Sequence, residues 1–174
     1  LPIHIAFLEL VFDPTCSLVF EAEQGNGTEM TQPPRRATEP LLSMAQIVTH
    51  TLLGVAVGAL LTALYTVLYA GAPSLADVRV VIFTVLVAAT MGFVLALRQP
   101  RLRLLKLFSG FPGLSVAVLG LTLTCLVLIT GLPILAGLFS MAPSGVTQTG
   151  GLVLVTMATV LLLTAGLQQV LSLS

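Results

Sequence analysis

The chain has 174 residues, of which 56% are hydrophobic and 8% are charged, and its formal net charge at pH 7 is +0. A soluble domain carries about 25% charged residues, so this composition excludes a soluble globular enzyme, and the absence of net positive charge excludes a nucleic-acid partner. Several apolar runs approach or exceed the roughly 20 residues needed to cross a bilayer. We therefore expect an integral, multi-pass protein whose main surroundings are the lipid bilayer.

The first predicted span, about residues 1–20, carries two acidic residues inside an apolar run. Glu9 and Asp13 are four residues apart, so on a helix they share a face, one turn apart. Carboxylates in a membrane are costly unless they are paired or bind a ligand. Pro14 removes a backbone N–H, so we expect the helix to kink or unwind there and to leave carbonyl oxygens free. Carboxylates and carbonyls suit a hard cation or a proton.

Residues 21–43 are polar and rich in Gly and Pro, and they predict a loop outside the bilayer. The sequence Leu-Glu-Leu-Val-Phe-Asp-Pro at residues 8–14 and the loop sequence Glu-Met-Thr-Gln-Pro-Pro-Arg-Arg-Ala-Thr-Glu-Pro-Leu at residues 29–41 together resemble one region of a known family. The region is the sixth transmembrane helix and the following loop of cation-transporting P-type ATPases, the group that contains the calcium and sodium pumps. The resemblance implies that the loop couples the ion sites to the catalytic part of the pump.

In that family a pair of cation ligands lies four residues apart on this helix, usually Asn and Asp. The resemblance places Glu9 and Asp13 on that pair. Phe12 and Pro14 stand where the family usually has Thr and Gly. The resemblance therefore implies a cation site and leaves open whether calcium, another cation or a proton is transported. The other interpretation is a buried acid pair that only fixes helix packing.

Four more spans are expected, which makes the fold an all-α polytopic transmembrane helix bundle of about five spans. Gly54 and Gly58 in the second span have a spacing that lets another helix approach closely. The sequence Gly-Leu-Pro at residues 131–133 predicts a kink or a helix end in the fourth. The four spans lie at about residues 47–70, 80–97, 114–139 and 152–171.

Basic residues are concentrated in two predicted loops. Residues 21–43 and 98–111 together hold six of the seven Lys and Arg residues. Because short loops rich in Lys and Arg stay in the cytoplasm, both loops are predicted to be cytoplasmic, with the N-terminus outside and the C-terminus inside. The chain starts at Leu1 without a basic signal-peptide region, so we expect a piece of a longer protein.

The third span offers one further candidate ligand. In the pump family a polar residue of the eighth helix contributes to one ion site, and aligning the apolar run at residues 85–87 with that helix brings Thr90 near this place. An uncharged Thr favours one bound cation over two, or a proton. The alternative is a hydroxyl bonded to the carbonyl of its own helix.

The resemblance implies the C-terminal transport segment of a P-type cation ATPase, helices six to ten, in the plasma (inner) membrane. The family's phosphorylation motif Asp-Lys-Thr-Gly-Thr and its Thr-Gly-Glu motif do not occur in the 174 residues. ATP and Mg2+ are therefore assigned to the N-terminal part of the same pump, and this segment alone is expected to bind no cofactor and to be non-catalytic. The alternative function is a free-standing five-span carrier or accessory subunit in which Glu9 and Asp13 form a proton relay.

Overall fold

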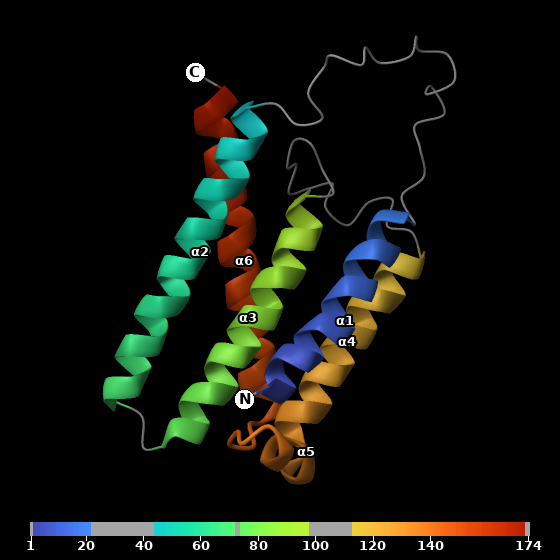
Figure 1. The fold of residues 1–174 in the computed structure, drawn as a ribbon, viewed down its shortest axis with the longest axis vertical. Coiled ribbons are helices and arrows are strands. Elements are labelled where there is room, and N and C mark those ends of the chain that lie inside the picture. Colours follow the sequence, from blue (N-terminus) through green and yellow to red (C-terminus); the bar gives the residue numbers. More distant parts are fainter. Residues whose placement is uncertain (1, 22–43, 72–73, 98–112, 173–174) are drawn as a thin grey trace.

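The computed structural model describes residues 2–21, 44–71, 74–97 and 113–172. These residues form six helices, in agreement with the predicted all-α class. Figure 1 shows that the long helices alternate in direction along the chain and that the two termini lie at opposite ends. Apart from Glu21, which ends α1, the predicted loops lie outside the described residues. The helices are α1 (Pro2–Glu21), α2 (Met44–Gly71), α3 (Leu75–Leu97), α4 (Gly113–Gly131), α5 (Pro133–Leu138) and α6 (Val146–Ser172).

Three of the described helices are long and apolar enough to cross a membrane. A helix rises 1.5 Å per residue, so about 20 residues cover the hydrocarbon core, and it bonds its own backbone polar groups where no water can. Val116–Gly131 of α4 is a shorter apolar stretch. By length and composition the described part of the chain thus has three candidate spans, where the sequence predicts about five. They are Gln46–Gly71, Leu75–Ala96 and Val146–Leu167.

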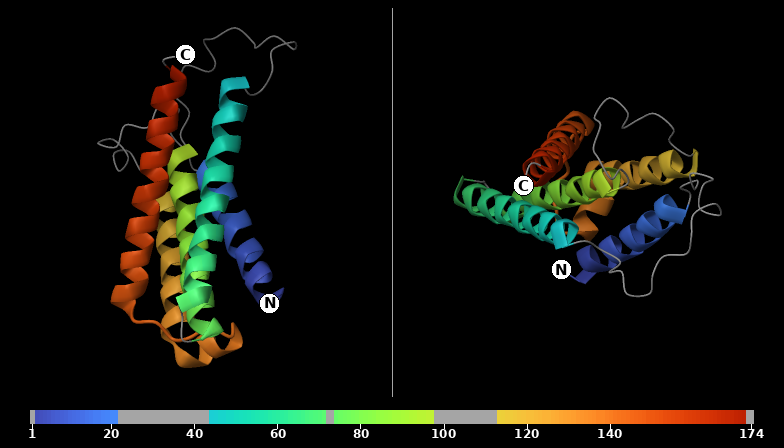
Figure 2. Two further views of the ribbon diagram at one scale, coloured as in Figure 1. Left: turned by 90° about the vertical axis from the view of Figure 1, so that its left-hand side faces the viewer. Right: turned by 90° about the horizontal axis from the view of Figure 1, so that it is seen from above.

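Helix α3 is the centre of the bundle. It packs against α6, α2, α1 and α4, and Figure 2 shows α6 and α1 on opposite sides of it. In its candidate span 61% of residues are buried, against 11% in α2 and 17% in α6. Any site between the described helices is therefore bounded by α3 on one side.

The contact between α3 and α6 is the most extensive in the bundle. Thr84, Ala88, Gly92 and Ala96 repeat every four residues on α3, and the three that have side chains are almost fully buried. A Cβ added to Gly92 would lie only 3.1 Å from the Cβ of Val160 on α6. Small residues let two membrane helices approach closely enough for van der Waals packing to hold them together.

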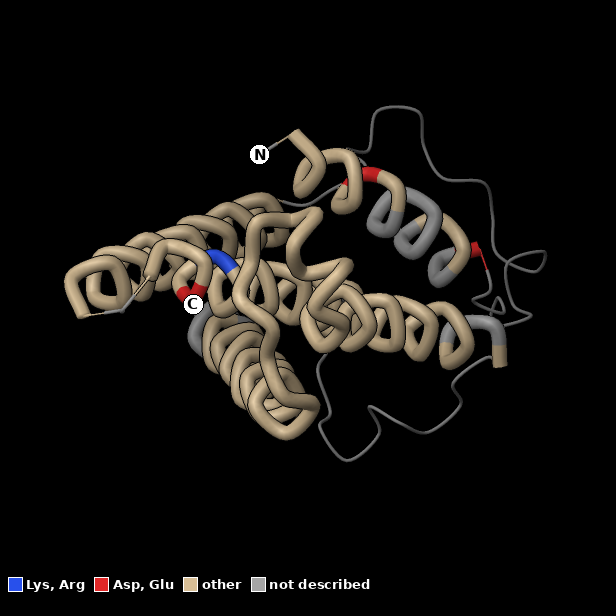
Figure 3. The backbone as a smooth tube through the Cα atoms, turned by 90° about the horizontal axis from the view of Figure 1, so that it is seen from below, with Lys and Arg blue, Asp and Glu red and all other residues tan. Residues whose placement is uncertain are grey.

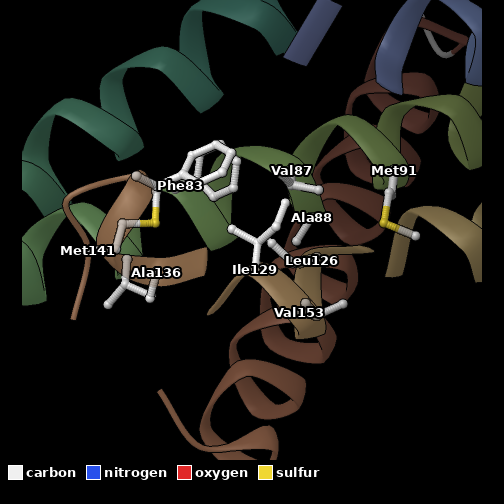
Figure 4. Close-up of a cluster of buried hydrophobic side chains, with 11 residues drawn as sticks. Phe83, Val87, Ala88, Met91, Leu126, Ile129, Ala136, Met141 and Val153 are labelled. Atoms are coloured by element: carbon white, nitrogen blue, oxygen red, sulfur yellow. The ribbon is translucent and has the colours of Figure 1, made fainter. Parts of the chain in front are cut away.

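The apolar core joins α3 to α4, α5 and α6. Figure 4 shows Phe83, Val87 and Met91 of α3 beside Leu126 of α4 and Val153 of α6. Leu126 and Val87 are completely buried. Because side chains from four helices interdigitate here, this cluster fixes the positions of the helices around α3.

The break predicted in the fourth span is present. Helix α4 ends at Gly131, Leu132 is extended, and Pro133 is the first residue of α5. Proline is tolerated there because the first residues of a helix have no intrahelical acceptor for their N–H groups. The turn after α5 folds back onto the bundle, since the backbone N–H of Ser144 donates to the carbonyl of Thr130 at 2.8 Å.

The orientation in the membrane can be tested by labelling. We expect cysteines placed at Thr28 and Gln99, in the two basic loops, to be shielded from an impermeant thiol reagent added outside intact cells. A cysteine at Pro143, which is exposed in the turn between α5 and α6, should react and is the positive control. Labelling of either loop position from outside would contradict the predicted orientation.

Candidate cation site

One face of α1 is fixed by packing against the bundle. Helix α1 contacts α4 and α3. Two pairs of rings make edge-to-face contacts. The ring centroids of His4 and Phe83 are 5.5 Å apart, and those of Phe7 and Phe139 are 5.9 Å apart. Leu8 packs against the same apolar core. These contacts set the rotation of α1 about its own axis.

Glu9 lies on the face of α1 that is turned away from these contacts. Its side chain is exposed, as are those of Ile5 and Leu10, the latter 75% exposed. Glu9 makes no hydrogen bond or ion pair with another described residue. Asp13 lies one turn further along α1, on the same side of the helix by its spacing, and its side chain is not among those described. The described helices therefore leave the position of Glu9 open to a further partner.

Of the two outcomes predicted beside Pro14, a kink or unwinding of the helix, the unwinding is wrong. Helix α1 is continuous from Pro2 to Glu21. Pro14 lacks only its own N–H, so the other backbone bonds of the helix remain available, and keeping them is favourable in apolar surroundings. The carbonyl of Leu10 still has no helical N–H partner, because that partner would be residue 14.

Thr90 is half-buried on α3, and its hydroxyl donates to the carbonyl of Leu86 at 3.1 Å. This is the alternative that the sequence left open, a hydroxyl bonded to its own helix. No hydrogen bond joins Thr90 to Glu9. The part of the chain that the structure describes also holds no group of three or more His, Cys, Asp or Glu residues that could bind a metal. A ligand role for Thr90 stays a prediction.

Charged residues are sparse along the described backbone, as Figure 3 shows. The sequence predicted the third span from about residue 80, but α3 begins at Leu75, so Arg79 lies one turn inside the helix. It lines a cavity of about 230 Å³ between α1, α2 and α3, together with His4 and Tyr65. Sequence reasoning assigned no role to this residue, although a single charge at the start of an apolar run was the available signal.

The fold and the apolar helices define the chain as an all-helical membrane domain. A family model described as "Cation transporting ATPase, C-terminus" matches residues 1–167, and the chain belongs to this family. It is the C-terminal membrane domain of a cation-transporting P-type ATPase, a family whose intact pumps use ATP and Mg2+. Neither the curated proteins nor the solved structures contain a match to the chain.

Proposed function

We propose that this domain contributes Glu9 and Asp13 to the intramembrane cation site of an ATP-driven pump of the calcium and sodium pump group. The observation that carries the proposal is the rotation of α1. His4, Phe7 and Leu8 face α3 and the core, and Glu9 lies on the exposed side. A carboxylate left in contact with lipid would be costly, so this side of α1 needs a polar partner in the assembled pump.

The chemistry of the proposed site explains why this chain supplies only part of it. A hard cation such as calcium takes about six to eight oxygen ligands, more than two carboxylates can give. The Leu10 carbonyl, freed by Pro14, is a further oxygen on the same helix. The remaining ligands come from helices of the N-terminal part of the pump, and the hydroxyl oxygen of Thr90 can join them through a lone pair while its O–H donates to the Leu86 carbonyl.

A second surface supports docking of the N-terminal part. Gly54 and Gly58 on α2 are both exposed, and a Cβ added at either position would meet no atom within 4 Å. Small residues at this spacing are typical of close helix contacts in membranes. The described helices leave this surface of α2 uncovered, which is what an additional transmembrane helix of the same pump requires.

In the proposed mechanism, ATP and Mg2+ act in the N-terminal part, where phosphoryl transfer drives the change between two states of the membrane domain. Within this chain, Glu9 and Asp13 hold the cation while α3 and the core keep α1 in place. Residues 21–43, of which only Glu21 is among the described residues, are proposed to transmit the change as a cytoplasmic loop. The proposed location is the plasma (inner) membrane. The family match gives no support to the free-standing carrier.

The role of Glu9 is tested by Glu9→Gln in the intact pump. The amide keeps an oxygen ligand but removes one charge, so we expect the apparent cation affinity in ATPase assays to fall about tenfold, equal to about 1.4 kcal/mol, with maximal activity retained. The control is Glu21→Gln, which removes an exposed acid at the end of the same helix. Equal cation affinities for Glu9→Gln and the parent would contradict the proposal.

A further inference from the structure

The cavity beside Arg79 combines a positive charge with apolar walls. Its volume is about 230 Å³, and it lies between α1, α2 and α3. Arg79, Ile82 and Leu86 line it from α3 at helical spacing, so the lining changes along one face of the helix from a guanidinium to aliphatic side chains. Leu8 of α1 adds another aliphatic wall. This arrangement matches an amphiphile, with a charged group at one end and a hydrocarbon chain at the other.

Arg79 lacks an acidic partner among the described residues. Its one described hydrogen bond runs from Nη1 to the carbonyl of Ser140 at 3.2 Å, which leaves other N–H donors of the guanidinium available. The nearby carboxylate of Asp77 accepts instead from the Ser74 hydroxyl at 2.6 Å. A half-buried cation among apolar side chains is stabilised by a bound anion.

The charged end of the cavity lies near one end of the candidate span of α3. Arg79 is one turn from the start of the candidate span Leu75–Ala96. Tyr65, which also lines the cavity, stacks on Tyr69 near the end of α2 with ring centroids 5.7 Å apart. Tyrosines gather where lipid headgroups meet the hydrocarbon core, so we infer that Arg79 is at the height of a lipid phosphate.

We propose that this cavity binds an anionic phospholipid, with its phosphate on Arg79 and part of one acyl chain along Ile82 and Leu86. A headgroup of net charge −1 complements a single guanidinium, whereas a choline headgroup would bring a second cation next to it. Free phosphate would leave the aliphatic walls unused. This site is separate from the proposed cation site and does not depend on it.

The test is native mass spectrometry of the delipidated intact pump with phosphatidylglycerol, phosphatidylcholine or inorganic phosphate. We expect the parent to retain phosphatidylglycerol preferentially, and Arg79→Gln to weaken that binding about tenfold. Arg98→Gln, which removes the same charge beyond the other end of α3, should bind like the parent. Leu86→Trp should also weaken binding, because it fills the apolar part and leaves the Arg79–Ser140 bond in place.

Four results would overturn the proposal. Equal retention of phosphatidylcholine would show that the charge does not select the lipid. Displacement of phosphatidylglycerol by inorganic phosphate would identify a free anion as the ligand. Unchanged binding in both Arg79→Gln and Leu86→Trp would place the lipid elsewhere, and absence of bound lipid in the parent would mean that another part of the pump fills the cavity. If Arg79→Gln fails to fold, Leu86→Trp alone decides.

Discussion

Asp13→Asn is expected to abolish cation-stimulated phosphorylation of the intact pump. Asp13 is next to Pro14, on the turn of α1 that carries the freed Leu10 carbonyl, so it is the acid with a further oxygen ligand close by. The substitution removes a charge from a site where several oxygens must enclose the cation together. We therefore expect a larger effect than from Glu9→Gln, whose amide resembles a ligand that many family members use at that position.

The measurement is phosphorylation from ATP as a function of cation concentration in purified pump. Nucleotide binding, assayed in parallel, should be unchanged in Asp13→Asn, because the proposed nucleotide site is in the N-terminal part of the pump. Asp77→Asn is the matched control, since it makes the same chemical change in the first turn of α3, where Asp77 accepts from Ser74. Parent-like cation dependence in Asp13→Asn would show that the acid pair is structural.

Gly92→Leu is expected to destabilise the domain by about 1–3 kcal/mol, the usual cost of overpacking a close contact. A Cβ at Gly92 would already lie 3.1 Å from the Val160 Cβ and 3.2 Å from its Cγ1, and Leu adds three more carbon atoms. The helices α3 and α6 would have to separate along the most extensive contact in the bundle. The readout is denaturant-induced unfolding of the purified pump in detergent.

Two further variants show whether this loss comes from the α3–α6 contact. Gly166→Leu on α6 places the same side chain at an exposed position, with no atom within 4 Å of the added Cβ, and should be close to neutral. Adding Val160→Ala to Gly92→Leu should recover part of the stability, because it removes Cγ1 of Val160, which would lie 3.2 Å from the added Cβ. Additive effects of the two substitutions would contradict direct packing of Gly92 on Val160.

The sequence predicted the helical class and the break between α4 and α5, because both depend on local chemistry. Apolar runs in lipid must be helical, and Gly131 with Pro133 ends one helix and starts another. The predicted unwinding beside Pro14 failed, because losing a single N–H does not outweigh the remaining backbone bonds of α1. The sequence also placed the start of the third span too late, at about residue 80, which left Arg79 outside the span although its alkyl stem can lie within a helix.

The candidate site was only partly accessible to sequence reasoning. Helical spacing alone put Glu9 and Asp13 on one face of α1. The direction of that face depends on two contacts between residues distant in the chain, that of His4 with Phe83 on α3 and that of Phe7 with Phe139. The bond from Thr90 to Leu86 was one of two alternatives, and the choice depends on the surroundings of α3. The cavity at Arg79 required three helices to be placed together.

The central claim, that Glu9 and Asp13 hold the transported cation, is tested most directly by equilibrium cation binding to the purified intact pump. Binding of the cation that best stimulates phosphorylation is measured for the parent, for Asp13→Asn and for Asp77→Asn. ATP is left out, so that no later step of the cycle contributes. We predict that Asp13→Asn loses saturable binding and that Asp77→Asn binds like the parent. Unchanged affinity and stoichiometry in Asp13→Asn would contradict the claim and place the transport site elsewhere.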